Sequence, residues 1–270
     1  MELDQIARNG MVLLGCGKMG SAMLEGGLAR GVSADSVYVI DPAPSDWLRS
    51  TGVNLNTALP LSPAAAILAV KPQMMGDALP QLQAFGNSKT LFISIAAGTS
   101  LVRFSEVLGA GTPIIRAMPN TPAAVGCGIT ALIGNASTSE RDLALAETLL
   151  AAVGTTVRLQ DESQMDAVTA LSGSGPAYVF HMIEAMAQAG EAEGLAPDLA
   201  MQLARATVIG AGQLAAGSDQ TAEQLRINVT SPKGTTAAAL EVLMDSDTGL
   251  PPLIARAIAA AAARSRELAQ

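Results

Sequence analysis

Short apolar runs alternate with longer helix-like segments over the first 160 residues of the chain. Runs without polar alternation are typical of strands buried on both faces of a parallel sheet. Because the connecting segments carry helical patterns, we expect a doubly wound α/β sheet of about seven or eight strands. The expected strands cover residues 11–14, 36–40, 66–70, 90–95, 112–117, 128–133 and 155–159, with a helix over 139–153.

Beyond residue 160 the chain consists of helix-favouring stretches separated by glycine, serine and proline. We therefore expect two domains, an α/β domain over residues 1–160 and an all-α domain over residues 161–270. The faces of the helical half are rich in alanine and methionine, and Ile254, Ile258 and Ala261 recur at helical spacing. Such faces are too apolar to be left in water, so this half predicts a homodimer or a larger assembly.

The composition excludes several classes of protein. The 270 residues are 49% hydrophobic with a net charge of −8, which argues against disorder and against a nucleic-acid or anionic membrane surface. Two cysteines and a single histidine, His181, suggest neither a disulfide framework nor a metal site. His181 lies in an apolar helix-like run, where a core or interface role is more typical than catalysis. The N-terminal segment has no signal layout, so we expect a soluble cytoplasmic protein with no membrane partner.

The strongest motif is a strand that runs directly into GCGKMG, residues 15–20, and then into a helix-like segment. In a GxGxxG turn of this kind, Gly15 allows the tight turn, Gly17 lets the backbone approach a pyrophosphate, and Gly20 lets the helix pack on the strand. The helix N-terminus adds amide donors and positive potential. The first domain is therefore predicted to bind a dinucleotide in a Rossmann arrangement.

Asp41 ends the second expected strand, where a carboxylate can accept hydrogen bonds from the adenosine ribose. A cofactor 2′-phosphate at this position meets like charge, and no lysine or arginine immediately follows Asp41 to neutralise it. The sequence thus predicts NADPH or NADH as cofactor and favours NADH. The alternative interpretation of Asp41 is that it only begins a turn with Pro42 and binds no ribose. Arg49 could still fold back to neutralise a 2′-phosphate.

Other strand ends belong to the same predicted crevice, because ligands of parallel sheets bind beyond the carboxyl ends of the strands. Two of them are AVKP, residues 69–72, and SIAAG, residues 94–98, whose small residues let a ring or ribose come close. Lys71 could neutralise a phosphate or a carboxylate, although a solvated lysine is as ordinary there. A third, IRAMPNTP at residues 115–122, forms a stiff polar turn typical of a binding wall.

Two turns in the helical half expose consecutive amides before a helix. They are SGSGPA, residues 172–177, and SPKGTT, residues 231–236. A substrate carboxylate could accept backbone N–H bonds from Gly234, Thr235 and Thr236, although helix capping alone also explains both turns.

Six segments together resemble the pyrroline-5-carboxylate reductases, which catalyse the last step of proline synthesis. The segments are GCGKMG, AVKP, SIAAG, RAMPNTP, LSGSGPAYVF and VTSPKGTT, in that family's order and spacing along the whole chain. The last three together are specific to the family rather than to Rossmann proteins at large. The resemblance implies a helical dimerisation domain, dimers that often form decamers, and reduction of a cyclic imine to L-proline with NADPH or NADH.

The resemblance also implies a site. Thr236 is the implied catalytic residue, near the imine nitrogen. The implied substrate-binding residues are Ser231, Gly234, Thr235 and Thr236, with Met118, Asn120 and Thr121 bordering the nicotinamide. We add Lys233 to the expected substrate-binding residues from its charge. Together with the glycine motif and Asp41, the expected cofactor-binding residues are Gly15, Cys16, Gly17, Lys18, Met19, Gly20, Asp41, Asn56, Ala69, Val70, Lys71, Pro72, Ala96, Ala97 and Gly98.

The chain departs from the family pattern at Lys233, where family members usually have glycine (SPGGTT). A lysine costs stability if this position needs a positive φ, and can strengthen carboxylate binding if it does not. We expect the second case because the substrate is an anion. Two other functions stay open. A β-hydroxyacid dehydrogenase or other imine reductase should have a lysine-centred catalytic helix, and a catalytically dead oligomer should bind cofactor without turnover.

Overall fold

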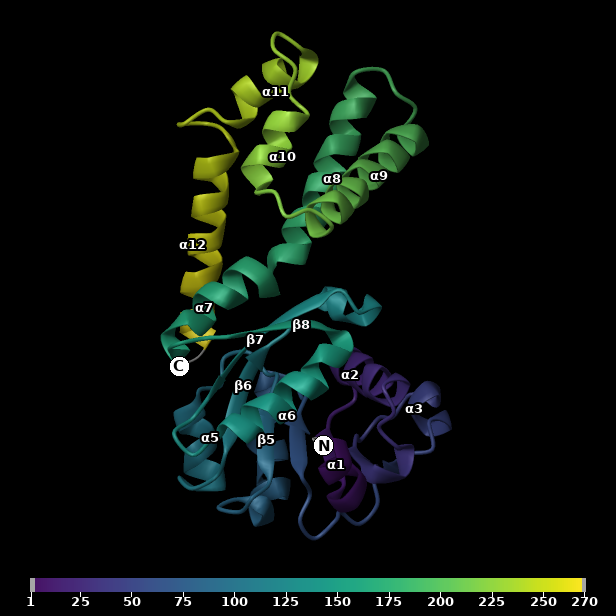
Figure 1. Cartoon of the computed structure of the whole chain (residues 1–270), viewed down its shortest axis with the longest axis vertical. Coiled ribbons are helices and arrows are strands. Elements are labelled where there is room, and N and C mark those ends of the chain that lie inside the picture. The colour runs from purple at the N-terminus through teal and green to yellow at the C-terminus, as the bar shows by residue number, and fades with distance from the viewer. Residues whose placement is uncertain (1–2, 269–270) are drawn as a thin grey trace. The chain divides into compact units, whose positions relative to one another are not determined.

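The computed structural model describes residues 3–268 and contains one sheet of eight strands within that range (Figure 1). Their order, β3-β2-β1-β4-β5-β6-β7-β8, begins with the 3-2-1-4-5-6 order of the Rossmann fold. The strand bounds are β1 (Met11–Leu14), β2 (Val37–Ile40), β3 (Asn54–Leu55), β4 (Ala65–Leu68), β5 (Leu91–Ser94), β6 (Ile114–Met118), β7 (Gly128–Gly134) and β8 (Gly154–Arg158).

The expected α/β class is confirmed, with one change of direction. Strands β1 to β6 are parallel, whereas β7 pairs with β6 in antiparallel fashion, Met118 opposite Ala131. A parallel return needs a crossover of about a dozen residues or more, and the short 3-10 turn Thr121–Val125 between β6 and β7 contains no such crossover. Strand β3 was not predicted, because a strand of two residues has no readable hydrophobic period.

Helices cover both faces of the sheet and form two cores. One face packs against α2 (Lys18–Ala29) and α6 (Glu140–Leu150), and the other against α5 (Leu101–Leu108) and the 3-10 segment Leu79–Phe85. Strands β1, β4 and β5 are buried along their whole length, which accounts for their unbroken apolar sequence. The other helices of this part are α1 (Leu3–Asn9), α3 (Asp46–Ser50), α4 (Met75–Ala78) and α7 (Met165–Val168).

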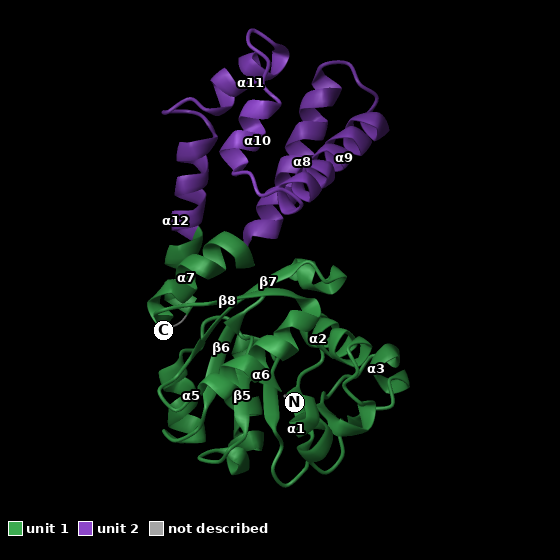
Figure 2. Cartoon of the chain, viewed as in Figure 1, with its two compact units in different colours: residues 1–173, 261–270 green, residues 174–260 purple. Residues whose placement is uncertain are grey.

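The contacts divide the chain into two compact units (Figure 2), one of residues 1–173 with 261–270 and one of residues 174–260. The contacts place the division after residue 173, whereas the sequence placed it after residue 160. The limits of the functional domains, 1–160 and 161–270, stay a prediction. Helix α7 belongs to the first unit, and so does the end of α12 (Leu250–Leu268), whose Ser265 hydroxyl donates to the Asp166 carboxylate at 2.6 Å.

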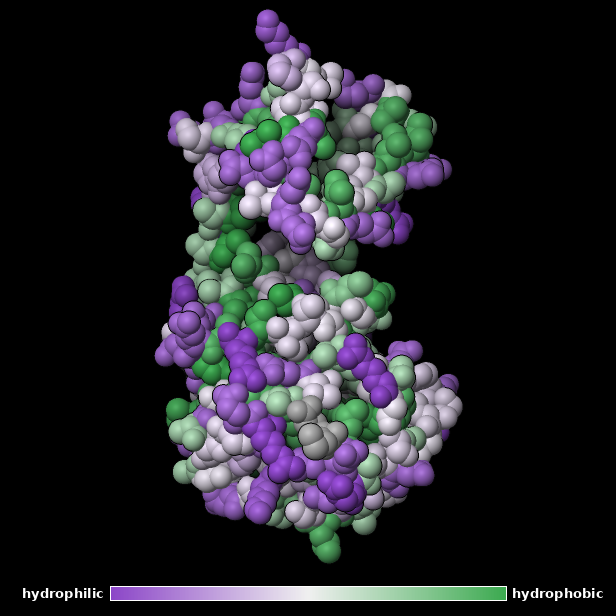
Figure 3. All heavy atoms as spheres, in the orientation of Figure 1, coloured by the Kyte–Doolittle hydropathy of each residue, from purple (hydrophilic) through white to green (hydrophobic). Residues whose placement is uncertain are grey.

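The second unit is helical and has very little interior. Its buried apolar cluster consists of Ala187, Ala200 and Ala204, with Ile183 packed against them. Many large apolar side chains of this unit are exposed instead, and Phe180 is 59% exposed. Figure 3 shows apolar residues distributed over its surface. Its helices are α8 (Gly175–Ala192), α9 (Pro197–Ala216), α10 (Ala222–Asn228), α11 (Thr235–Leu243) and the first part of α12.

A cluster of this size cannot offset the conformational entropy of ordering five helices, so the unit needs a further apolar surface to cover it. None of the helices within residues 3–268 combines the length and apolarity that a membrane crossing requires.

Candidate active site

The glycine loop follows β1 and is fixed by contacts at its first residue. The Gly15 amide donates to the Ile40 carbonyl at 2.8 Å, so the loop begins as a continuation of the β1–β2 ladder. Gly15 has φ +88°, and a Cβ there would lie 2.8 Å from Cγ1 of Val70 and 3.0 Å from the Ala69 carbonyl oxygen. Glycine is therefore required for the turn and for the close approach of the β4 end.

The other two glycines of the motif have different surroundings. A Cβ on Gly20 would lie 2.5 Å from the Gly15 carbonyl oxygen, so Gly20 lets α2 pack on the loop. A Cβ on Gly17 would meet nothing within 4 Å, and Gly17 has an ordinary φ of −71°. Nothing in the fold requires glycine at position 17. The open space above it suits a ligand that approaches the backbone closely, as a pyrophosphate does.

Helix α2 begins at Lys18 with Gly17 as its N-cap, and no side chain caps it. Its first turn contains no acidic residue. The first amides of a helix have no intrahelical acceptor, so those of Lys18, Met19 and Gly20 form a positively polarised end suited to an anion.

Asp41 is part of the loop's structure. Its Oδ2 accepts the Cys16 amide at 2.7 Å, and its Oδ1 accepts the Ala43 amide at 2.8 Å. Each carboxylate oxygen keeps further acceptor capacity, which ribose hydroxyls can use. Burial, and secondarily the charge of Asp41, raises the pKa of the Cys16 thiol to about 11. The Cys16 side chain is thus a neutral thiol that packs in the core below the glycine loop.

Asn56, the residue directly after β3, holds the backbone of Asp41. Its Oδ1 accepts the Asp41 amide at 2.9 Å, and its Nδ2 donates to the Asp41 carbonyl at 2.8 Å. Asn56 itself has φ +52°, a region that asparagine tolerates better than most residues. Both side-chain groups of Asn56 are thereby used to place Asp41.

The ends of β4 and β5 lie next to this loop in the sheet. The Ala69 amide donates to the Leu14 carbonyl at 2.8 Å, so Ala69 and Val70 adjoin Gly15. Lys71 is exposed, and Pro72 begins the 3-10 turn Pro72–Met74. After β5, Ala96 is buried and the partly buried residues 97 and 98 continue as an open loop, in which Gly98 has φ +77°.

The end of β6 supplies Met118, which is 6% exposed, followed by Asn120 and Thr121. The Asn120 Oδ1 accepts the Ile129 amide at 3.0 Å, so this side chain ties the turn to β7. Thr121 is exposed at the start of its 3-10 turn. The structure therefore brings the predicted cofactor residues together at the carboxyl ends of β1, β2, β4 and β5, with Met118 at the end of β6.

The second unit contains the predicted substrate turn before α11. Gly234 is the N-cap of this helix and provides no side-chain cap. The Gly234 amide donates to the Ser231 carbonyl at 3.0 Å, which closes a four-residue turn. The expectation that the Gly234 amide is available to a carboxylate is therefore wrong, because the turn uses it. The amides of Thr235 and Thr236, at the first two helical positions, have no intrahelical acceptor.

Lys233 has φ +59°, a left-handed conformation. With proline before it and the Ser231–Gly234 hydrogen bond across it, Lys233 occupies the position of a type II turn that normally takes glycine. The expectation that this position does not need a positive φ is wrong. The chain accepts a strained lysine where a glycine would have no strain.

The other turn of the helical half, at residues 172–177, spans the boundary of the two units. The first unit ends with a π-helical turn, Thr169–Gly173, a form that is frequent at functional sites. In the second unit α8 begins at Gly175 with Pro176 in its first turn, and no side chain caps it. His181 in α8 is exposed, and its Nδ1 lies 3.2 Å from Oε2 of Glu184. A core role for His181 is therefore wrong for the single chain, and an interface role stays a prediction.

The fold and the glycine-loop site define a dinucleotide-binding oxidoreductase with a separate helical domain. The family model described as pyrroline-5-carboxylate reductase dimerisation matches residues 162–268, and the one described as NADP oxidoreductase coenzyme F420-dependent matches residues 11–98. A pyrroline-5-carboxylate reductase of Pseudomonas aeruginosa is 38% identical over 266 residues, covering 96% of this chain and 97% of that protein. The chain belongs to the pyrroline-5-carboxylate reductase family.

Further relatives agree with this assignment. A pyrroline-5-carboxylate reductase of Synechocystis is 45% identical over 205 residues, covering 75% of this chain and 74% of that protein. The solved structure of a pyrroline-5-carboxylate reductase of Coxiella burnetii matches with a TM-score of 0.91 at 34% identity, over 97% of this chain and 99% of that one. A Plasmodium falciparum pyrroline carboxylate reductase with NADP bound matches with a TM-score of 0.82 at 29% identity, over 97% and 98% of the two chains.

These findings bear on the earlier expectations. The oxidoreductase class, the nicotinamide cofactor and self-association through the helical domain are confirmed. The alternative functions, another imine reductase or dehydrogenase and a dead oligomer, are not favoured. A ketol-acid reductoisomerase matches at 11% identity with a TM-score of 0.66, which shows only that the fold is shared.

Proposed function

We propose that this chain reduces the C=N bond of 1-pyrroline-5-carboxylate to give L-proline, the last step of proline biosynthesis. The observation that carries the proposal is the uncapped start of α11, in a chain that matches a pyrroline-5-carboxylate reductase over 96% of its length. A helix end without a capping side chain or an acid in its first turn leaves its amides to a small anion, and the substrate is a carboxylate.

The residues present fit a nicotinamide dinucleotide in the first unit. The space above Gly17 and the polarised amides of Lys18, Met19 and Gly20 suit the pyrophosphate, and Asp41 suits the ribose. Residues 69–72 and 96–98 border the ribose and nicotinamide in this proposal, with Met118, Asn120 and Thr121 beside the ring. When bound, the reduced cofactor supplies the hydride.

The second unit holds the substrate in this proposal. The amides of Thr235 and Thr236 bind the carboxylate, while the Thr236 hydroxyl holds the ring nitrogen. Ser231 and Lys233 lie beside them in the turn. A protonated C=N bond is already electrophilic, so orientation of the ring and not proton transfer by a side chain is the main task of the enzyme. Acid–base residues are accordingly few in the proposed site.

We propose that NADH is favoured over NADPH. A 2′-phosphate beside Asp41 meets a carboxylate whose oxygens are already fixed by the Cys16 and Ala43 amides, so Asp41 cannot turn away without releasing the loop. This is a preference and not an exclusion. The NADP in the Plasmodium falciparum structure shows that this relative accepts the phosphorylated cofactor.

We further propose that the homodimers assemble into decamers of five dimers. The proposal is supported by the resemblance and by the amount of apolar surface that the second unit exposes, Phe180 and Val242 among it. The cytoplasmic location stays a prediction from the sequence. Size-exclusion chromatography with light scattering distinguishes a dimer from a decamer directly.

The decisive experiment follows absorbance of the reduced nicotinamide with pyrroline-5-carboxylate and NADH or NADPH, together with the proline formed. Turnover with proline as product supports the proposal, and cofactor binding without turnover contradicts it. Thr236→Ala should lower kcat by about 10- to 100-fold with little change in cofactor affinity. Thr236→Ser, which keeps the hydroxyl, is the matched control, and equal losses of kcat and of cofactor affinity in Thr236→Ala would reject the assignment.

A further inference from the structure

A buried arginine in β6 has no part in the reaction described above. Arg116 is 5% exposed, and its Nη1 donates to Oε1 of Glu162 at 2.8 Å. Its Nε is buried without a hydrogen-bond partner among the described residues. Burying a guanidinium is costly, and an apolar pair of similar size is often as stable as a buried ion pair. Stability alone therefore does not account for Arg116.

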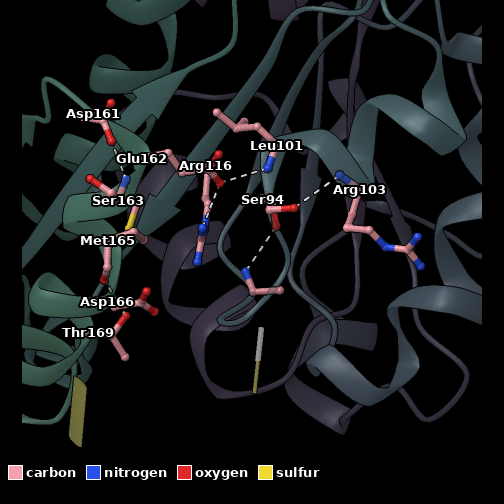
Figure 4. A network of polar contacts seen from close by, with 12 residues as sticks. Ser94, Leu101, Arg103, Arg116, Asp161, Glu162, Ser163, Met165, Asp166 and Thr169 are labelled. Atoms are coloured by element: carbon pink, nitrogen blue, oxygen red, sulfur yellow. Dashed lines mark hydrogen bonds and ion pairs between the residues drawn. The ribbon is translucent and has the colours of Figure 1, made fainter. Parts of the chain in front are cut away.

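Glu162 makes a second contact with the same oxygen. Its Oε1 accepts the amide of Leu101, the first residue of α5, at 2.9 Å (Figure 4). A carboxylate at a helix N-terminus interacts favourably with the free amides and with the helix dipole. One carboxylate oxygen thus joins β6, through Arg116, to the start of α5.

The backbone around Glu162 is itself fixed. Glu162 begins the 3-10 turn Glu162–Gln164, which a capping box closes between Asp161 and Gln164. The Asp161 carboxylate accepts the Ser163 amide at 2.8 Å, and hydrogen bonding by the Ser163 side chain, and secondarily by its amide, lowers the pKa of Asp161. The Glu162 side chain therefore extends from a rigid turn.

The segment between these contacts is the loop of residues 95–100, which joins β5 to α5. It begins after Ser94, which is fully buried and pairs in register with Arg116 of the neighbouring strand. The Ser94 hydroxyl accepts the Ala96 amide at 3.3 Å, which fixes the start of the loop. The Glu162 contact with Leu101 fixes its end. The loop contains residues 96–98, which border the nicotinamide in the proposed function.

We infer that Arg116 and Glu162 are positioning residues of the reductase. The ion pair holds the loop of residues 95–100 at the distance from β6 that hydride transfer requires, without either side chain touching cofactor or substrate. The inference rests on the proposed function. A shift of about 1 Å at a reacting centre can lower a rate about a hundredfold, whereas adenosine binding depends on the glycine loop and Asp41. Loss of the pair therefore lowers kcat and leaves cofactor affinity nearly unchanged.

The test uses Glu162→Gln in the full-length enzyme. Glutamine keeps the shape of the side chain but removes the negative charge that pairs with Arg116 and stabilises the N-terminus of α5. We expect kcat to fall about tenfold or more and the Kd of the reduced cofactor to change by less than about threefold. With cofactor carrying deuterium at the transferred position, the isotope effect on kcat rises, because hydride transfer becomes slower than product release. A loss of folded enzyme would lower kcat without raising the isotope effect.

Glu106→Gln is the matched control. Glu106 lies on α5, the helix whose first amide Glu162 accepts, and forms an exposed ion pair with Arg103 at 2.7 Å. The same chemical change at Glu106 should therefore leave kcat within about twofold of the wild type. If Glu162→Gln also keeps the wild-type kcat and isotope effect while the wild type reduces pyrroline-5-carboxylate, the inference fails and the proposed function stands. A wild type without turnover overturns both.

A second variant keeps the test decisive if Glu162→Gln fails to fold. The double variant Arg116→Met with Glu162→Leu replaces the pair by apolar side chains, a change that buried pairs often tolerate in stability. It leaves the Leu101 amide without its acceptor, so we expect a folded enzyme with the same lowered kcat and raised isotope effect. Wild-type kcat in the double variant shows that the pair does not position the loop and overturns the inference.

Discussion

The left-handed lysine in the substrate turn leads to a quantitative prediction for Lys233→Gly. A non-glycine residue in this region costs about 1–2 kcal/mol relative to its preferred conformations. Glycine removes that strain, but it adds about 0.4–1 kcal/mol of backbone entropy to the unfolded chain. The midpoints of these two ranges differ by about 0.8 kcal/mol, which is the net stabilisation that we expect. The φ of +59° at Lys233 is the single structural basis for this figure.

Stability is measured by thermal and urea unfolding of both proteins at one fixed concentration, because assembly couples to unfolding. For a chain of this size, the change corresponds to a rise in Tm of about 1–4 °C. Lys233→Gln serves as the control, since glutamine keeps the strained conformation and should leave Tm near that of the wild type. A Lys233→Gly protein that is less stable than the wild type would refute the strain argument.

The same two variants test whether the ammonium group assists the substrate carboxylate. Lys233 is exposed, so an ion pair there is worth at most about 1 kcal/mol. We expect the KM for pyrroline-5-carboxylate to rise about two- to fivefold in both variants and the KM for the cofactor to stay unchanged. An unchanged or lowered substrate KM in both variants would show that the lysine contributes strain without benefit.

Three further sites give predictions. Gly17→Ala should change the free energy of unfolding by less than about 0.5 kcal/mol but weaken cofactor binding, measured by fluorescence titration, about tenfold or more. Gly20→Ala should lower the free energy of unfolding in urea by about 1–3 kcal/mol, because its Cβ would lie 2.5 Å from the Gly15 carbonyl oxygen. Asp41→Ser should raise the NADPH-to-NADH ratio of kcat/KM about tenfold, and a wild type that already prefers NADPH contradicts the proposed role of the carboxylate. A thiol reagent at pH 8 should modify exposed Cys127 quickly and Cys16 only on unfolding, since a pKa of about 11 leaves about one Cys16 in a thousand ionised. The raised Cys16 pKa favours the folded state below about pH 9, and this contribution should be lost as the pH rises toward 11.

Much of the fold could be predicted because its elements are buried on both sides. Strands β1, β4 and β5 have no polar alternation, and each ends in glycine, proline or small residues that mark its boundary. The direction of β7 was not predicted, since a hydrophobic run carries no information on direction. Only the length of the connection from β6 contains that signal. The two-residue strand β3 depends on its partner β2 and has no local signature.

The site could be predicted where it depends on backbone chemistry and not where it depends on tertiary contacts. The GxGxxG pattern located the glycine loop, but the bond from the Cys16 amide to Asp41 joins residues that are distant in sequence. The role of Arg116 was missed for the same reason, since its partner Glu162 follows two strands later. For Lys233 the local pattern was ambiguous. Proline at the second position of the turn suits types I and II alike, and glycine at the fourth position favours type I, whose third position has a negative φ.

The three-alanine interior of the second unit has a consequence for the enzyme in the cell. A unit with such a small buried core folds mainly on association with another chain. The specific activity of the enzyme should therefore fall as the protein is diluted. The turn at residues 231–236 is built on that unit, and its order should therefore vary with the amount of protein synthesised. A defective copy that still associates would occupy places in the assembly, so adding an inactive variant to the wild-type protein should lower the activity per wild-type chain.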